Sequence, residues 1–188
     1  MSIYRRLARQ IGTLRFWDEV RKILWAKLCL GRLAPWSRRI RLQGRIVVKN
    51  RGELIIGRNV QMCGYMVPIE MRVERGARLE IGDFTLMNYG CSFGATRAVC
   101  IGPHAIIGPY CNIVDSNYHS LDPVHRLNRP ESAPVILHEN VWLGARVLVL
   151  PGVTIGANSV IGAGSVVTHS IPSNVLAAGV PAVVIRNL

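Results

Sequence analysis

A hexapeptide repeat constrains the fold of this chain more than any other feature of its sequence. Between residues 141 and 170 an aliphatic side chain recurs at every sixth position, and two earlier segments keep the same interval. The recurring positions are Leu143, Val149, Ile155, Ile161 and Val167, preceded by Ile81, Met87 and Phe93 and by Ile101, Ile107 and Ile113. A period of six residues fits neither an amphipathic helix nor an alternating strand.

Each repeat suits a short strand that packs one aliphatic residue inward and then turns a corner at a glycine or another small residue. A single coil of such strands cannot bury its inward side chains, so the coils must stack on one another. Hydrophobic residues make up 49% of the 188 and aromatic residues only 6%, which favours an aliphatic core in repeated slots. We therefore predict a mainly β protein, with a parallel β-helix over residues 46–188.

One long segment interrupts the repeat. Ile113 and Leu143 are 30 residues apart, a multiple of six, so the repeat is in phase on both sides of the segment 115–139, which does not follow it. Long excursions from a rigid scaffold are often binding loops. We therefore predict an extruded active-site loop at 115–139.

Four motifs carry a resemblance to a known family: N-V-W-L-G-A (140–145), P-G-V-T-I-G (151–156), G-A-G-S-V-V-T (162–168) and, in the loop, H-S-L-D-P (119–123). With the repeats, they resemble the hexapeptide-repeat acyltransferases, nearest the galactoside and maltose O-acetyltransferase group. The resemblance implies a left-handed, three-sided β-helix that forms a homotrimer with active sites between subunits. It also implies acetyl-CoA as the acyl donor, and no metal is expected.

The loop holds the predicted catalytic residues. By resemblance, His119 stands at the position of the family's catalytic histidine, although Ser120 replaces the usual proline. An imidazole with a pKa near 6.5 can take a proton from an acceptor hydroxyl and return it to the departing thiolate. Asp115 could hold that imidazole, bind the acceptor or cap the loop. The predicted acceptor-binding residues are Asn88, Tyr118 and Arg126, and Asn88 could instead satisfy a turn.

The C-terminal coils would bind the donor. The predicted cofactor-binding residues are Trp142, Ala145, Ala163, Thr168, His169 and Arg186. By resemblance, Trp142 borders the reaction centre, the backbone N–H of Ala145 faces the thioester oxygen, and Ala163 lines the pantetheine arm. The last three would lie near the nucleotide and its phosphates, where the family often has lysine in place of His169.

The N-terminal segment, residues 1–45, has a different character. Residues 1–50 carry a net charge of +11, whereas the rest of the chain is close to neutral. Apolar residues follow a helical stripe that is broken at Arg21; it consists of Ile3, Leu7, Ile11, Leu14, Trp17, Leu24 and Leu28. The basic residues that lie largely off this stripe are Arg5, Arg6, Arg9, Arg15, Lys22 and Lys27. A basic, tryptophan-containing amphipathic helix is typical of peripheral membrane contact, here through residues 1–40. Packing on the trimer or over the first coil is the alternative.

No run of 18 apolar residues and no secretory signal are present, and the five cysteines have no C-x-x-C spacing. We expect a cytoplasmic protein, able to lie peripherally at the inner face of the membrane, with no nucleic-acid partner. The leading prediction is an O-acetyltransferase acting on a sugar or surface-polysaccharide precursor, free or lipid-linked. Alternatives are N-acetylation of an amino sugar, a non-catalytic β-helix scaffold, or a gamma-class carbonic anhydrase-like zinc enzyme, for which His119 and His125 lack the expected spacing.

Overall fold

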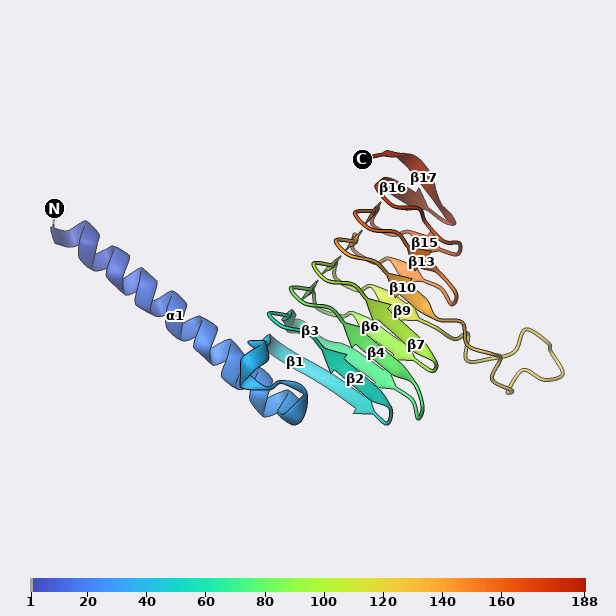
Figure 1. The fold of residues 1–188 in the computed structure, drawn as a ribbon, viewed down its shortest axis with the longest axis horizontal. Helices are drawn as coiled ribbons and strands as arrows, with labels where there is room; N and C mark the ends of the chain where they lie inside the picture. Colours follow the sequence, from blue (N-terminus) through green and yellow to red (C-terminus); the bar gives the residue numbers. More distant parts are fainter. Residues whose placement is uncertain (1) are drawn as a thin grey trace.

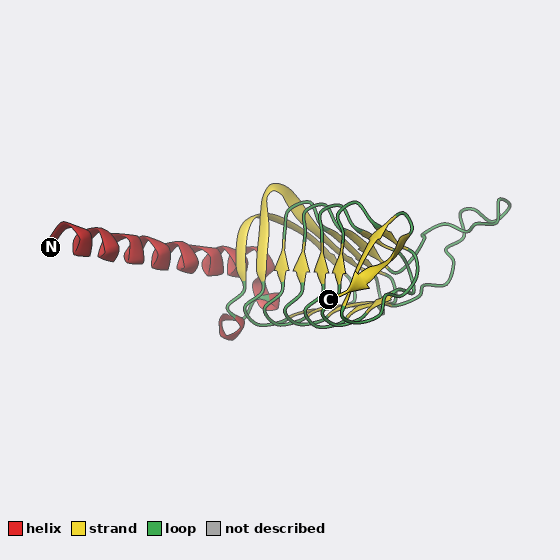
Figure 2. Ribbon diagram, turned by 90° about the horizontal axis from the view of Figure 1, so that it is seen from above, coloured by secondary structure: helices red, strands yellow, loops and turns green. Residues whose placement is uncertain are grey.

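The structure is a computed structural model that describes the backbone of residues 2–188 and the side chains of residues 13–188. A long helix, α1 (Ser2–Leu30), is followed by two short 3₁₀ turns, η1 (Gly31–Leu33) and η2 (Trp36–Arg38), and then by a stack of β-coils (Figure 1). The helix extends away from one end of the stack, and a loop leaves the stack on the other side (Figures 1 and 2).

The coils have three faces, which the chain visits in the same order in every coil. Face 1 contains β2 (Glu53–Ile56), β4 (Arg78–Ile81), β7 (Ala98–Ile101), β10 (Val135–Leu137) and β13 (Thr154–Ile155). Face 2 contains β5 (Leu86–Met87), β8 (Ile106–Ile107), β11 (Trp142–Leu143), β14 (Val160–Ile161) and β16 (Val175–Gly179), with β17 (Ala182–Asn187) antiparallel to β16. Face 3 contains β6 (Ser92–Ala95), β9 (Asn112–Val114), β12 (Leu148–Val149) and β15 (Val166–Val167).

At the first coil, the long strands β1 (Arg41–Asn50) and β3 (Gln61–Val73) bend across faces 2 and 3, because the start of β3 pairs with β5 and its end with β6. We name the corner between faces 1 and 2 corner A, that between faces 2 and 3 corner B, and that between faces 3 and 1 corner C. Corner A includes residues 102–104 and 156–158, corner B includes 108–110, 144–146 and 162–164, and corner C includes the loop and 168–170.

The repeat positions form the core. Each hexapeptide supplies one face, so three hexapeptides complete one coil, and the inward residues stack in register between coils. All of them are buried: Ile81, Ile101 and Ile155 on face 1, Met87, Ile107, Leu143 and Ile161 on face 2, and Phe93, Ile113, Val149 and Val167 on face 3. The predicted parallel β-helix with an aliphatic core is confirmed.

The corners explain the small and polar residues of the repeat. At corner A, Asn140, Asn158 and Asn174 adopt positive φ values, which asparagine tolerates better than most residues. The Asn140 amide donates to Asn158 at 3.0 Å, and the Asn158 amide donates to Asn174 at 2.9 Å. At corner B a Cβ on Gly108 would lie 2.6 Å from the carbonyl carbon of Gly144 in the next coil. Glycine is therefore required there for the coils to approach.

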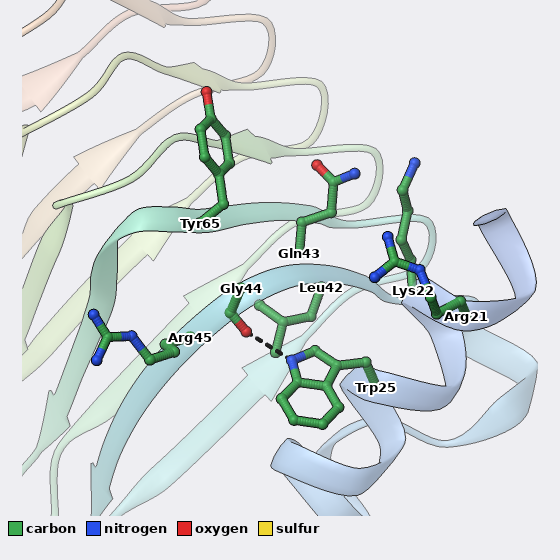
Figure 3. Close-up of a pocket in the computed structure, with 8 residues that line it drawn as sticks. All are labelled: Arg21, Lys22, Trp25, Leu42, Gln43, Gly44, Arg45 and Tyr65. Carbon is green, nitrogen blue, oxygen red and sulfur yellow. Dashed lines mark hydrogen bonds between the residues drawn. The ribbon is translucent and has the colours of Figure 1, made fainter.

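The C-terminal end of α1 packs on the first coil. Trp25 Nε1 donates to the Gly44 carbonyl at 2.6 Å (Figure 3). The Glu19 carboxylate pairs with Arg41 at 2.5 Å, and Ala26 is fully buried. No helix among the described residues is long and apolar enough to cross a membrane. The side chains of Ile3, Leu7, Ile11, Arg5, Arg6 and Arg9 lie outside the described residues.

Two predicted boundaries differ from the structure. The boundary between residues 45 and 46 falls inside β1, which begins at Arg41 because Arg41–Gly44 pairs with β3. The end of the predicted loop 115–139 is also structured. Val135–Leu137 forms β10 between β7 and β13, with Val135 and Leu137 buried, so the segment outside strands is residues 115–134.

Candidate active site

Asp115 anchors the start of the loop. Its side chain is fully buried, and its carboxylate accepts the backbone N–H groups of Thr96, Arg97 and Ala98 at 2.7–3.0 Å and the Thr96 hydroxyl at 2.7 Å. The Thr96 hydroxyl also meets the hydroxyl of Ser132 at 2.5 Å, so both ends of the loop are tied to the same turn at corner C. Within residues 13–188, no hydrogen bond joins Asp115 to His119. The geometry therefore matches the loop-capping alternative for Asp115.

His119 lies exposed on the loop, and its ring is held by the loop itself. Its Nδ1 lies 3.2 Å from the carbonyl oxygen of Arg126. The Ser120 N–H donates to the carbonyl oxygens of Arg126, at 3.3 Å, and Asn128, at 3.0 Å, which closes the loop on itself. A carbonyl oxygen can only accept, so Nδ1 carries the proton in the neutral ring and Nε2 keeps its lone pair. Arg126 thus contributes its backbone carbonyl to the loop, and its predicted contact with the acceptor stays a prediction.

Tyr118 joins the loop to face 3. Its phenol lies where a side chain on Gly94 would stand, since a Cβ on Gly94 would be 2.4 Å from the hydroxyl. The Arg129 guanidinium lies over the ring, 5.7 Å from its centroid. Burial, followed by the charge of Asp115, raises the pKa of Tyr118. Beside it is a cavity of about 290 Å³, whose polar lining includes Arg72 and Asn112.

The donor-side residues lie on other parts of the coils. Trp142 projects from face 2 and is 50% exposed. Ala145 and Ala163 occupy the same position at corner B in successive coils, because β11 and β14 pair in register. The Ala145 N–H has no acceptor in the described part of the chain and is free for a ligand. Asn88 is at the same corner, two coils below Ala145, where its amide donates to the Ile107 carbonyl at 3.3 Å.

The remaining predicted donor residues are not near this corner. Thr168 and His169 follow β15 at corner C, where the Thr168 hydroxyl lies 2.8 Å from His169 Nδ1. Arg186 is on β17, paired with Leu176 at the last coil of face 2. Corners B and C are separated by the width of face 3, about 13 Å for four residues of strand. One chain alone does not bring His119 together with the backbone N–H of Ala145.

Sequence reasoning missed the residues that hold the loop. Gly94 lies in β6 and Thr96 directly follows that strand, twenty-one and nineteen residues before Asp115. Their partners in the loop, Tyr118 and Asp115, come from the next coil. The only hint in the sequence is S-F-G-A-T at 92–96, where the repeat slips by two residues. Within the part of the chain with described side chains, no three His, Cys, Asp or Glu residues converge on a possible metal position.

Comparison with known proteins gives consistent matches. A family model described as "Bacterial transferase hexapeptide (six repeats)" matches residues 134–169. Galactoside O-acetyltransferase of Escherichia coli (strain K12) is 41% identical over 117 residues, covering 60% of this chain and 56% of that protein. The WbbJ protein of the same strain, provisionally named as a lipopolysaccharide biosynthesis O-acetyl transferase, is 32% identical over 192 residues, covering 96% of this chain and 92% of that protein.

A solved structure extends the likeness. The hexapeptide-repeat acetyltransferase of Vibrio cholerae O1 biovar eltor, in complex with acetyl coenzyme A, has a TM-score of 0.56 and 27% identity, covering 95% of this chain and 89% of that one. The match to four other curated relatives, galactoside O-acetyltransferase included, spans only 55–59% of their length. The near full-length relative, the family model and the coil architecture agree, and the chain belongs to the hexapeptide-repeat acyltransferase family.

Proposed function

We propose that the protein is an acetyl-CoA-dependent O-acetyltransferase acting on a hydroxyl of a sugar or surface-polysaccharide precursor, with His119 as the general base. The observation that carries this proposal is the contact between His119 Nδ1 and the Arg126 carbonyl. It holds the ring in the tautomer whose exposed Nε2 can accept a proton. The relative named for lipopolysaccharide biosynthesis supports the acceptor class, and the acetyl coenzyme A complex supports the donor.

The proposed reaction is one acyl transfer. The acceptor hydroxyl gives its proton to Nε2 of His119 while its oxygen attacks the thioester carbon. The Ala145 N–H donates to the oxyanion that forms. The carbon–sulfur bond then breaks, and the CoA thiolate takes the proton back from His119, which returns the base to its starting state.

The site we propose requires two copies of the chain. His119 leaves corner C, whereas the free N–H of Ala145 lies at corner B, across face 3. A symmetric ring of chains would set corner C of one subunit against corner B of the next. We therefore propose a homotrimer with sites between neighbours, as the family resemblance implies.

Subunit complementation tests the shared site. Co-expressed His119→Ala and Ala145→Pro chains should each be inactive alone but recover about a quarter of wild-type activity in random mixed trimers. Mixed assemblies that recover nothing would contradict a site shared between chains, and light scattering on the wild type would measure the assembly directly.

The catalytic role of His119 is tested by its own substitution. His119→Ala should lower acetyl transfer about 10²–10⁴-fold and leave acetyl-CoA binding intact. His125→Ala is the matched control, because His125 is exposed on the same loop and its ring contacts Asp122, at 2.6 Å, and not the Arg126 carbonyl that holds His119. The assay follows labelled acetyl from acetyl-CoA onto nucleotide sugars, amino sugars and lipid-linked oligosaccharides. Near-wild-type transfer by His119→Ala would refute the assignment, and failure of the wild type to bind acetyl-CoA would favour a scaffold.

The proposal includes peripheral contact of α1 with the cytoplasmic face of a membrane. Four apolar side chains at helical spacing are exposed on α1: Trp17, Leu24, Trp25 and Leu28. With the half-buried Val20 and one cation, Arg21, they line a groove of about 380 Å³. The double substitution Trp17→Ser, Leu24→Ser should abolish co-flotation of the full chain with anionic phospholipid vesicles. Val183→Ser, which removes an exposed residue at the other end of the molecule, should not. Unchanged flotation of the double variant would favour packing of α1 within the trimer.

A further inference from the structure

Three tyrosines form a ladder along corner B. Tyr65, Tyr89 and Tyr110 belong to three successive coils, and their ring centroids are 5.5 and 5.4 Å apart in edge-to-face contact. The Arg146 guanidinium continues the ladder in the next coil, 5.8 Å from the centroid of the Tyr110 ring. In the single chain Tyr65 is 60% exposed and Tyr110 42% exposed, so the ladder presents aromatic surface along corner B, the corner that we propose faces the neighbouring subunit.

The backbone is shaped to hold these rings. Tyr110 adopts a φ of +59°, a left-handed conformation that is unfavourable for a bulky residue by roughly 1–2 kcal/mol. Its ring lies directly over Gly90, where a Cβ would be 2.5 Å from the ring. The equivalent turn residue in the coil of Ala163 is Gly164, which takes the same conformation without strain. The fold therefore does not require an aromatic residue at this corner.

The ladder continues the row of corner B residues, Ala145 and Ala163, that we propose to bind the donor. Arg146 directly follows Ala145, and Asn88, the predicted acceptor-binding residue, directly precedes Tyr89. At the other end, Tyr65 lines a cavity of about 490 Å³ at the junction with α1, together with Gln43 and Arg45. Figure 3 shows the polar ends of Tyr65 and Gln43 directed to the same side, away from Trp25. One continuous strip thus runs from the reaction centre to the base of α1.

We infer that this strip binds the non-reacting part of the acceptor, and that the acceptor is a linear oligosaccharide of at least three sugars. The inference rests on the proposed function. The C–H face of a sugar ring is apolar and packs on aromatic rings, while hydroxyl and amide groups beside the rings fix its orientation. One tyrosine per coil gives a repeat close to the length of one pyranose in an extended chain. The lower end of the strip, at Arg45 and Tyr65, meets only the longer chains.

A binding series with graded chain length tests the inference. The probes are fragments of bacterial O-polysaccharides with one to six sugars, titrated calorimetrically into the intact protein without CoA. Wild-type affinity should rise with length up to the end of the strip, and Tyr65→Ala should remove about a 3- to 10-fold gain for the longer fragments. Phe84→Ala is the matched control, because Phe84 is an exposed aromatic with positive φ at corner A, stacked on His104 at 5.0 Å, and it should keep the full gain.

The outcomes separate this inference from the proposed function. Wild-type affinity that is independent of chain length, or a length gain that survives in folded Tyr65→Ala, overturns the ladder as an acceptor site. If the protein acetylates the fragments but its affinity does not depend on their length, the enzyme proposal is supported and the ladder proposal is contradicted. Length-dependent binding without transfer from acetyl-CoA to any fragment would support the ladder and contradict the enzyme proposal.

Discussion

Substitution of Asp115 separates two roles that this residue could have. If its carboxylate anchors the loop, its loss should reduce stability, and activity should fall only where the loop is released. If it orients His119, its loss should reduce the rate while stability is unchanged. The structure favours the anchor, because three N–H groups, of Thr96, Arg97 and Ala98, and one hydroxyl point at a carboxylate with no exposed surface.

Asp115→Ala and Asp115→Asn should differ in how much stability they lose. Asp115→Ala leaves three N–H groups without an acceptor, while the Thr96 hydroxyl can still donate to Ser132. Each buried unsatisfied donor costs about 1–3 kcal/mol before relaxation. Allowing for water entering the space, we expect a loss of about 3–6 kcal/mol, or about 6–24 °C in Tm. In Asp115→Asn, the amide oxygen can take the Oδ2 position and accept from all three N–H groups, while the Thr96 hydroxyl turns to accept from the amide. The charge is lost together with the hydrogen bond from the Thr96 N–H to Oδ1, at 2.8 Å, which costs about 2–3 kcal/mol.

Thermal melting and steady-state kinetics on both variants decide the matter. Asp115→Asn should keep kcat within about tenfold of wild type, because His119 is held by the Arg126 carbonyl and not by Asp115. A residue that fixes the tautomer of a catalytic histidine loses about 10⁴-fold on the same change. A folded Asp115→Asn protein that melts near the wild-type temperature but has lost more than about 10²-fold in kcat would refute the anchoring role.

Three further predictions concern corner B and the base of the loop. Ala145→Pro removes the backbone N–H that we propose to bind the oxyanion, so kcat should fall about 10²–10³-fold. The chain should still fold, because Pro109 already occupies the same position of corner B one coil below. Ala157→Pro at corner A is the control and should keep full activity. Gly94→Ala sets a Cβ 2.4 Å from the Tyr118 hydroxyl, 3.2 Å from Val114 Cγ1 and 3.7 Å from Tyr118 Cζ, so most of the loss in Tm should be restored by adding Tyr118→Phe. Destabilisation that persists in full would place the strain elsewhere. Because burial raises the pKa of Tyr118, the stability it contributes is complete below about pH 10 and lost as pH rises through its raised pKa. Ultraviolet titration should show a late-titrating tyrosine that is missing in Tyr118→Phe.

The repeat predicted the core well because each hexapeptide is a local unit with one inward residue. Leu143 and Ile161 are both buried on face 2, eighteen residues apart, as the period requires. The position of the loop was equally readable, since the phase of the repeat is kept across the gap. The end of the loop could not be predicted in the same way. Strand β10 resumes face 1 with only two inward residues, Val135 and Leu137, and such a short stretch resembles a loop in isolation.

The contacts that define the site were harder to predict, because they join neighbouring coils. Thr96 and Asp115 are nineteen residues apart, and their pairing depends on which residues of two coils lie at corner C. The ladder at corner B has the same cause: Tyr89 and Tyr110 are unremarkable turn residues until the stack puts one above the other. The repeat shows which residues share a face. Which side chains are neighbours at a corner can be predicted only when the register between successive coils is known.

The same geometry explains why one chain would not complete the proposed site. Asp115 ties the loop to the turn at Thr96, so the loop begins at corner C and leads away from the coils that carry Ala145 (Figure 1). If a neighbouring subunit receives the loop, as we propose, the anchor that directs His119 toward that neighbour also withdraws it from the Ala145 N–H of its own chain. Loss of that anchor in one subunit should lower activity at the site that receives its loop. The Ala145 N–H of the altered subunit should still serve the His119 of the next one.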